Sequence, residues 1–186
     1  MSTQTNPPRS PRLLRLLPPA TTTSSFWWDE IVVPIGSAKL DVLLISDGEA
    51  LTGLWFGNSH PGMPQSPGWV RDRAPVAAAA EQLAAYAEGD LTQFELPLRP
   101  AGSEFQRAVW QRLLDIPYGV TTSYGKVATD VGRPNGSRAV GAAVGSNPIA
   151  IVIPCHRVIG ANGSLTGYGG GLDNKVALLK LEGVSL

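Results

Sequence analysis

The segment TTSYGKVATDVGRPNGSRAVGAAVGSNP, residues 121–148, constrains the fold more than any other part of the chain. Ser123 is a candidate N-cap residue, and the helix after it is expected to end near Gly132. Residues 133–136, Arg-Pro-Asn-Gly, are typical of a turn, after which Ser137 is expected to cap a second helix. Two short helices joined by such a turn predict a helix-turn-helix.

The second of these helices has an unusual body, because it consists almost entirely of Ala, Gly and Val. Each Gly inside a helix costs roughly 0.5–1 kcal/mol relative to Ala, so its presence needs a reason. Either the helix packs closely against another helix, or its surface comes close to the backbone of a ligand. Composition favours packing, but the second interpretation stays open, because Arg138 is a long cation on this otherwise small surface.

Local patterns assign the other elements of the carboxy-terminal half. Ser103 and Gln106 have capping-box spacing at the start of an amphipathic helix. The apolar run IAIVI, residues 149–153, predicts a short buried strand that ends at Pro154. A glycine-rich loop follows, and Asp173 is expected to cap a last helix.

The amino-terminal half combines strand and helix signals. Residues 31–35 and the two apolar runs around the turn at residues 47–48 predict antiparallel strands. Residues 74–90 have high helix propensity and contain a glycine suited to end the helix. LTQFELPL, residues 91–98, predicts one more strand.

No residue of this half indicates chemistry, so we expect it to be a scaffold, with His60 a solvated loop residue. The predicted fold class is α/β (α+β). A small amino-terminal α/β domain with antiparallel strands covers residues 26–98. A carboxy-terminal helix-turn-helix (winged-helix-like) domain covers residues 99–186. Residues 1–25, rich in Pro, Ser and Thr, are expected to form a disordered tail.

Composition argues against several classes of protein. Arg15 interrupts the apolar patch of the amino end, which therefore lacks the h-region of a secretory signal. No stretch approaches the ~20 apolar residues that span a bilayer. A single cysteine cannot form an internal disulfide, and no Cys/His cluster indicates a metal site. We expect a reduced, cytoplasmic protein with no metal and no membrane contact.

Charge supports a nucleic-acid partner only weakly. The net charge is zero, but the two halves differ. From Ala101 onward the chain has eight Lys and Arg and five Asp and Glu, whereas the residues before it include seven Lys and Arg and ten Asp and Glu. This asymmetry is mild, so any affinity for nucleic acid has to come from a local surface.

The one cysteine lies in IVIPCHRVIG, between Pro154 and His156. With an ordinary pKa near ~8.5, a thiol is only a few per cent ionised at neutral pH, so a reactive cysteine needs activation. His156 is a candidate base that acts through a water molecule, with a carboxylate to orient its ring. A buried inert thiol and a reactive thiol both fit this pattern.

Four segments carry a family resemblance: NPIAIVIPCHRVIG, SYGKVA, GSRAVGAAVGSNP and GSLTGYGGGL. In one register from about Phe105 to Glu182, the chain resembles the O6-alkylguanine-DNA alkyltransferases, for which PCHRV is highly specific. The amino-terminal half resembles them only loosely. The resemblance implies a small α/β domain followed by a domain whose helix-turn-helix enters the minor groove of double-stranded DNA.

The resemblance also implies catalytic roles. Cys155 matches the alkyl acceptor and His156 its water-linked base, which Glu182 would orient. Asn147 resembles the hinge asparagine that braces the turn holding the cysteine. Tyr124 matches the tyrosine that hydrogen-bonds the purine and contacts the neighbouring phosphate.

Other matches concern the base pocket and the DNA. Tyr168 and Gly169 resemble the glycine-rich pocket wall, Val158 the residue whose carbonyl accepts from the guanine amino group, and Lys175 a lysine beside the pocket. Arg138 matches the arginine finger that fills the space of the extruded nucleotide. The remaining DNA contacts implied are Ser137, Gly125, Arg133 and Ala161.

The implied reaction is the flipping of O6-alkylguanine out of the duplex and irreversible transfer of its alkyl group to the cysteine, without a cofactor. Each molecule would react once, because nothing is in view to hydrolyse the thioether. We expect a monomer and leave cooperative binding along DNA open.

Two other functions compete with this one. A Cys-His acyl hydrolase would need an oxyanion hole and a deacylating water. A damaged-DNA-binding module without turnover would fit the fold, but alkyltransferase-like proteins of that kind replace the cysteine, which this chain keeps.

Overall fold

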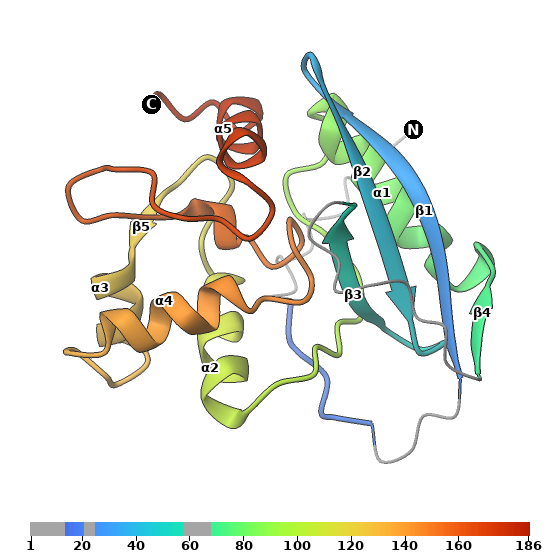
Figure 1. The fold of residues 1–186 in the computed structure, drawn as a ribbon, viewed down its shortest axis with the longest axis horizontal. Coiled ribbons are helices and arrows are strands. Elements are labelled where there is room, and N and C mark those ends of the chain that lie inside the picture. The colour runs from blue at the N-terminus through green and yellow to red at the C-terminus, as the bar shows by residue number, and fades with distance from the viewer. Residues whose placement is uncertain (1–13, 21–24, 58–67) are drawn as a thin grey trace, which may run out of the picture.

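The computed structural model describes residues 14–20, 25–57 and 68–186. Figure 1 shows a sheet and helix α1 forming one half of the molecule, with helices α2 to α5 forming the other. The mixed α/β (α+β) fold is therefore confirmed. His60 lies outside the described residues.

The sheet of the amino-terminal half has the strand order β3-β2-β1-β4. Strands β1 (Phe26–Ile35), β2 (Ala38–Ser46) and β3 (Leu51–Phe56) pair antiparallel, as predicted from their apolar runs. The short strand β4 (Trp69–Arg71) pairs parallel with β1. The turn between β2 and β3 includes Gly48, whose φ of 92° suits glycine.

Helix α1 (Ala77–Glu88) follows the short 3-10 helix η1 (Ala74–Val76) and contacts β1. It ends at Gly89 with a φ of 83°, the left-handed cap that the sequence predicts. Leu83 and Tyr86 are fully buried on its inner face. The alanine-rich sequence thus forms a helix with one buried face and a defined C-terminal end at Gly89.

The strand predicted for residues 91–98 is wrong. Its backbone groups find other partners: Gln82 hydrogen-bonds both the N–H and the carbonyl of Glu95 through its side chain. Pro97 has no N–H to donate to a ladder. Only Leu98 makes isolated β-bridges in this segment.

The helical half contains the predicted helix-turn-helix. Helix α2 (Glu104–Leu113) begins with a capping box between Ser103 and Gln106, as predicted. Helix α3 (Tyr124–Asp130) is capped by Ser123, whose side chain accepts from the N–H of Lys126. A turn leads to α4 (Ser137–Gly145), which packs on α2 and α3.

Two predicted caps are corrected by the structure. Ser137 is the first residue of α4 and not its cap, because Gly136 occupies the N-cap position without a side-chain bond. Asp173 lies in the first turn of α5 (Leu172–Leu181), whose N-cap is Gly171. Glycine is itself a common N-cap residue. In both helices it takes that position, and the polar residue predicted as the cap lies in the first turn.

Residues 149–153 form a tight turn and not the predicted strand. They are buried, which explains the apolar sequence, but Ile151 adopts a φ of 66° that interrupts an extended conformation. The cysteine then begins η2 (Cys155–Arg157), followed by β6 (Val158–Ile159). Strand β6 pairs parallel with β5 (Thr122–Ser123).

Part of the predicted tail is ordered. Gln111 accepts from the N–H of Leu16 and donates to the carbonyl of Leu14, and the N–H of Leu17 donates to Leu98. Leu14 and Leu16 also pack against the hydrophobic core. Apolar contacts and satisfied backbone groups therefore hold residues 14–17, against the expectation of disorder up to residue 25.

One continuous apolar cluster runs through both halves. Leu54, fully buried in β3, links them through its backbone: its N–H donates to Pro148 (2.8 Å) and its carbonyl accepts from Ala150 (3.1 Å). The turn before the cysteine is thus attached directly to the sheet. Among the described residues, no helix is long and apolar enough to cross a membrane.

We expect Leu54→Ala to lower the free energy of unfolding by about 2–5 kcal/mol, because it leaves a cavity where the two halves meet. Urea denaturation measures this. Val32 is 57% exposed in β1, and Val32→Ala serves as the control with an effect within about 0.5 kcal/mol. Equal effects of the two substitutions would contradict the assigned role of Leu54.

Candidate active site

The turn that presents the cysteine is held by Asn147. Its Oδ1 accepts from the N–H of Ile149 (3.0 Å), and its Nδ2 donates to the carbonyl of Ile153 (2.8 Å). The same Nδ2 lies 3.1 Å from the Sγ of Cys155. One side chain thus closes the turn around Ile151 and also contacts the sulfur.

The residues after the cysteine form a buried acid–base cluster with Glu182. His156 Nε2 lies 2.9 Å from Glu182 Oε1, and both side chains are fully buried. Arg157 donates to the same carboxylate through Nε (2.9 Å) and Nη2 (2.8 Å) and to the carbonyl of Ile116 through Nη1 (2.6 Å). The buried carboxylate is therefore paired with a cation and positions the imidazole.

The hydrogen bond to Glu182 also fixes the tautomer of His156. An ionised carboxylate only accepts hydrogen bonds, so Nε2 carries the hydrogen of the neutral ring and Nδ1 carries the lone pair. Nδ1 is buried and has no hydrogen-bond partner among the described residues. It is the ring atom that can accept a proton.

Glu182 has further donors from outside this cluster. The hydroxyl of Tyr86, on α1, donates to Oε1 at 2.7 Å. The N–H of Gly119 donates to Oε2 at 3.1 Å. Gly119 has a φ of 72°, and a Cβ there would lie 2.8 Å from the carbonyl oxygen of Glu182, so only glycine fits.

Burial dominates the electrostatics of the thiol. It raises the pKa of Cys155, although the Asn147 and Tyr168 side chains and the charge of Lys175 oppose the shift. The resting cysteine is therefore a protonated thiol at neutral pH. It requires a base to form the nucleophilic thiolate.

The neighbouring groups are in the complementary states. Burial lowers the pKa of His156 against the opposing influence of Glu182, so the imidazole is neutral. Burial alone would raise the pKa of Glu182, but hydrogen bonds from His156 and Arg157 hold it well below its usual range. The site at rest thus contains a neutral thiol, a neutral imidazole and an ionised carboxylate.

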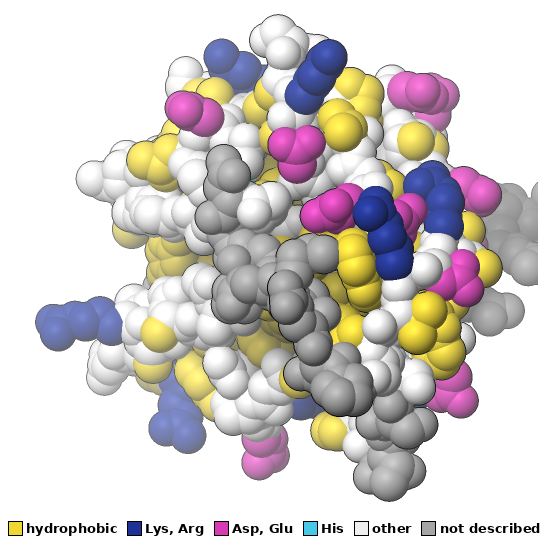
Figure 2. All heavy atoms as spheres, turned by 45° about the vertical axis from the view of Figure 1, so that its right-hand side comes forward, with side chains coloured by type: hydrophobic (Ala, Val, Ile, Leu, Met, Phe, Trp, Pro, Cys, Tyr) yellow, Lys and Arg dark blue, Asp and Glu magenta, His cyan; other side chains and the backbone are white. Residues whose placement is uncertain are grey.

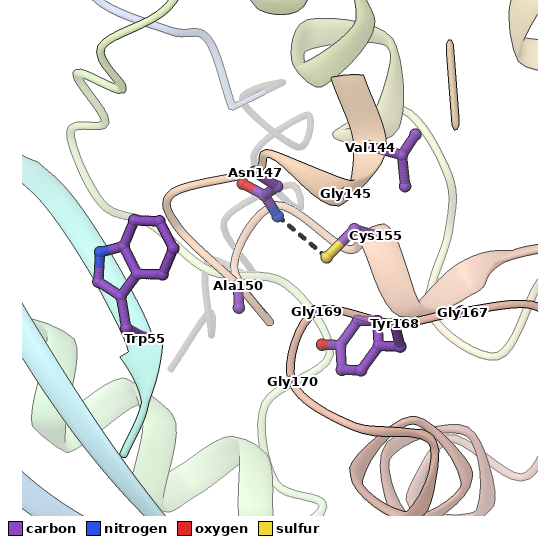
Figure 3. A pocket seen from close by; sticks show the side chains of 10 residues that line it. All are labelled: Trp55, Val144, Gly145, Asn147, Ala150, Cys155, Gly167, Tyr168, Gly169 and Gly170. Atoms are coloured by element: carbon purple, nitrogen blue, oxygen red, sulfur yellow. Dashed lines mark hydrogen bonds between the residues drawn. The ribbon is translucent and has the colours of Figure 1, made fainter. Parts of the chain in front are cut away.

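A cavity of about 140 Å³ opens beside the cysteine. Figure 3 shows the Cys155 sulfur directed toward Asn147, with Tyr168 on one side and the indole of Trp55 across the cavity. Trp55 belongs to β3, so the amino-terminal half forms part of the wall. The other lining residues are Val144, Gly145, Ala150, Gly167, Gly169 and Gly170.

The glycine-rich loop reaches the cavity because it packs tightly on β3. A Cβ at Gly170 would lie 2.2 Å from a ring carbon of Phe56, so no other residue fits. The rings of Phe56 and Tyr168 also contact each other, with centroids 6.0 Å apart. The sheet therefore determines where the loop, and with it Tyr168 and Gly169, can lie.

Lys175 and Val158 are joined directly to each other. The fully buried Lys175 donates from Nζ to the carbonyl of Val158 at 2.7 Å. Burial lowers the pKa of Lys175, whereas the nearby Cys155 opposes the shift. The carbonyl of Val158, which we expected to accept from guanine, thus already has one donor.

The residues predicted to contact DNA lie mainly around the junction of α3 and α4. Tyr124 follows β5 and packs on α4, where a Cβ on Gly141 would lie 3.8 Å from its ring. A Cβ on Gly125 would lie 3.7 Å from Ser137 Oγ. Ser137 and Arg138 are exposed at the start of α4.

The remaining predicted contacts are less closely grouped. The guanidinium of Arg133 lies over the ring of Phe105, 5.9 Å from its centroid. Ala161 is exposed in the glycine-rich loop. Neither position by itself indicates contact with a ligand.

Packing, the first of the two reasons considered above, accounts for one face of α4. Val140, Ala143 and Val144 are buried, and Trp110 of α2 donates to the carbonyl of Ala143 at 2.7 Å. On the other face, the small residues Ala139, Ala142 and Gly145 are exposed. Packing explains one face of the helix, and the other face is a smooth surface.

Comparisons with known proteins agree on one family. The family described as 6-O-methylguanine DNA methyltransferase, DNA binding domain, matches residues 104–184. A methylated-DNA–protein-cysteine methyltransferase from Mycolicibacterium paratuberculosis is 59% identical over 64% of this chain and 72% of its own length. One from Methanosarcina acetivorans is 49% identical over 81% of this chain and 94% of its own.

The chain belongs to the methylated-DNA–protein-cysteine methyltransferases. The crystal structure of the Mycobacterium tuberculosis O6-methylguanine methyltransferase is similar over 84% of this chain and 92% of that one, with a TM-score of 0.75 and 46% identity. A crystal structure of the Mycobacterium tuberculosis protein in complex with DNA is similar with a TM-score of 0.74. As a member, this methyltransferase repairs DNA by direct reversal and uses its acceptor cysteine once.

In this methyltransferase, the structure brings the predicted cluster of Cys155, His156, Glu182 and Asn147 together. Tyr168 and Gly169, predicted for the wall of the base pocket, line the cavity beside the cysteine. Tyr124 is not among its lining residues, and its hydroxyl accepts a hydrogen bond from Thr166 at 3.1 Å.

The sequence did not reveal three residues of the site. Arg157 directly follows His156, and a cation next to the Cys-His pair was the signal available in the sequence. Trp55 and Tyr86 come from the half that we expected to be only a scaffold. No local pattern distinguishes them from core aromatic residues.

The depressed pKa of Glu182 makes stability depend on pH. We expect Glu182→Gln to destabilise the protein by about 3–5 kcal/mol at neutral pH, because Arg157 stays buried without its partner. The contribution of the carboxylate is fully present above the unfolded-state pKa near ~4.3 and is lost as the pH falls toward the folded-state value. The difference between the two proteins should therefore shrink on acidification.

Chemical denaturation between neutral and acidic pH measures this difference. The exposed Glu88 on α1 provides the control, since Glu88→Gln should change stability little at any pH. A difference between wild type and Glu182→Gln that grows on acidification would contradict the proposed ion pair.

Proposed function

We propose that Cys155 takes the alkyl group from an O6-alkylguanine that the protein holds outside the DNA duplex, with His156 as the base and Glu182 as the group that orients it. The observation that carries this proposal is that the chain's single cysteine borders a cavity while the next residue is hydrogen-bonded to a buried carboxylate. Family membership gives the reaction, and the contacts of Cys155, His156 and Glu182 support the roles that we propose for them.

The chemistry balances with these groups. The thiol proton passes through a water molecule to Nδ1 of His156, and the thiolate attacks the alkyl carbon as the carbon–oxygen bond breaks. Guanine leaves as an anion that receives a proton from Tyr124, and solvent exchange restores both groups. No cofactor is required, and the thioether product remains on the protein.

Lys175 and Asn147 support the thiolate as it forms. The charge of Lys175 and the Nδ2 of Asn147 both favour the ionised sulfur over the thiol. Tyr168 and Gly169 would form the wall against the base, and Val158 would offer its carbonyl to the guanine amino group through its second lone pair.

For DNA, we infer that α4 approaches the minor groove of double-stranded DNA with its exposed small residues. That groove is only ~6 Å wide, so small side chains permit close contact. Arg138 would fill the space of the flipped nucleotide, which offsets part of the few kcal/mol that flipping costs. Further contacts would come from Ser137, Tyr124, Gly125, Arg133 and Ala161.

The surface agrees with docking through the helical half. Figure 2 brings the sheet half forward, and its described Lys and Arg side chains are mixed with Asp and Glu. The described residues of this face therefore form no basic surface for a phosphate backbone. We therefore assign DNA binding and alkyl transfer to residues 99–186, with residues 26–98 as the scaffold that supports them. We also propose that the protein acts in the cytoplasm as a monomer.

We expect Cys155→Ser to abolish alkyl transfer but to leave binding to DNA intact, because the hydroxyl is a far weaker nucleophile of nearly the same shape. An intact-mass spectrum after incubation with a duplex containing O6-methylguanine should show one added methyl group on the wild-type protein and none on the variant. Turnover well above one methyl per molecule would support a hydrolase instead. Binding without any methyl on the wild-type protein would support a recognition module.

We expect Arg138→Ala to slow repair within duplex DNA by about tenfold, because nothing then fills the vacated stack. Reaction with the free base O6-methylguanine, which needs no flipping, should change much less. Single-turnover rates on both substrates measure the contrast, and Lys180→Ala, at an exposed cation of α5, is the control. An equal loss of rate on duplex DNA and on the free base would contradict the assignment of Arg138 as the arginine finger.

A further inference from the structure

The hydroxyl of Tyr86 reaches into the catalytic cluster from the amino-terminal half. Tyr86 is fully buried on α1 and donates to Glu182 Oε1 at 2.7 Å. The same oxygen lies 2.9 Å from Nε2 of His156. A residue more than 60 positions away from the cysteine in sequence thus shares one carboxylate oxygen with the base.

The surroundings of Tyr86 hold its ring in place. Its ring centroid lies 5.4 Å from that of Phe94 and 6.0 Å from that of Tyr118. Burial and the charge of Glu182 raise the pKa of Tyr86, so its hydroxyl stays protonated and remains a donor at neutral pH. The hydrogen bond to Oε1 is therefore part of the cluster at rest.

We propose that Tyr86 is a positioning residue for alkyl transfer, and that its hydroxyl holds Glu182 against His156 and limits how strongly the carboxylate attracts a proton onto the ring. This inference rests on the proposed function, in which His156 is the base. It gives the amino-terminal half a direct influence on the chemistry. Tyr86 itself is not expected to touch the substrate.

The physical argument concerns the charge on Oε1. Each donor to a carboxylate oxygen stabilises its negative charge and leaves less of it to stabilise a neighbouring imidazolium. Removal of the Tyr86 hydroxyl leaves His156 and Arg157 as the donors to Oε1. The imidazolium should become more favourable, so His156 should bind a proton at higher pH.

Other groups near His156 act on the same equilibrium and stay unchanged in the test. Glu182 favours the imidazolium, whereas the charges of Arg157 and Lys175 disfavour it. The remaining titratable neighbours of the cluster are Cys155, Tyr118 and Tyr168.

The test compares Tyr86→Phe with Tyr118→Phe. The first keeps the buried ring and removes only the donor to Glu182. The second removes a hydroxyl that donates to the backbone carbonyl of Leu181 at 3.0 Å, directly beside Glu182, and so controls for a lost hydrogen bond in the same place. Single-turnover methyl transfer from a duplex containing O6-methylguanine is measured from about pH 4 to 9, because burial lowers the pKa of His156 and the range must extend well below the usual pKa of His.

We expect Tyr86→Phe to move the acid limb of the rate profile upward by about 0.5–1 pH unit, since only part of one hydrogen bond to a charged group is transmitted to the ring. DNA affinity should be unchanged, and Tyr118→Phe should not move the limb. A loss of rate that is uniform over the whole pH range would mean a purely structural role and would overturn the proposal.

An NMR titration of His156 separates this inference from the proposed function. The chain has two histidines, so His60→Gln leaves one ring signal to follow. An upward shift of the His156 pKa in Tyr86→Phe supports the coupling even if His156→Gln transfers methyl at the wild-type rate, which would refute His156 as the base. An unchanged titration overturns the coupling.

If Tyr86→Phe does not fold, 3-fluorotyrosine incorporated at position 86 tests the same coupling. It keeps the ring and strengthens the donor, so the acid limb and the His156 titration should both move to lower pH. No shift with this residue would also contradict the proposal.

Discussion

The buried carboxylate of Glu182 is the interaction on which the rest of the site depends. It accepts hydrogen bonds from α1, from the loop before α3 and from the residues that follow the cysteine. An ionised group in such a place is tolerated only because a buried arginine and several donors surround it. The carboxylate thereby fixes three distant segments of the chain relative to one another, and the imidazole takes its orientation from it.

The thiol is kept unreactive at rest by the same burial that shapes its cavity. A permanently ionised cysteine would react with any small electrophile, and each such event would consume a molecule of a protein that acts only once. With a raised thiol pKa and a neutral imidazole beside it, the nucleophile forms only as it is used. The raised pKa of the thiol therefore protects a cysteine that can react only once from other electrophiles.

Much of this was predictable because its signals are local. The capping box at Ser103, the cap at Ser123 and the Cys-His pair are read within a few residues of sequence. The wrong predictions have non-local causes. Residues 149–153 have the apolar sequence of a strand, but they form a turn because the Asn147 side chain hydrogen-bonds their backbone. Trp55 and Tyr86 read as ordinary core aromatics, since their partners lie far away along the chain.

One consequence of the backbone contacts of β3 concerns the protein after its single reaction. As the outermost strand of the sheet, β3 would expose unpaired N–H and carbonyl groups, which are templates for adding a strand from another molecule. Residues 97–99 and 148–150 occupy those groups at Leu51 and Leu54. A molecule that has reacted once is not regenerated, and this covered edge closes one route by which such molecules would aggregate.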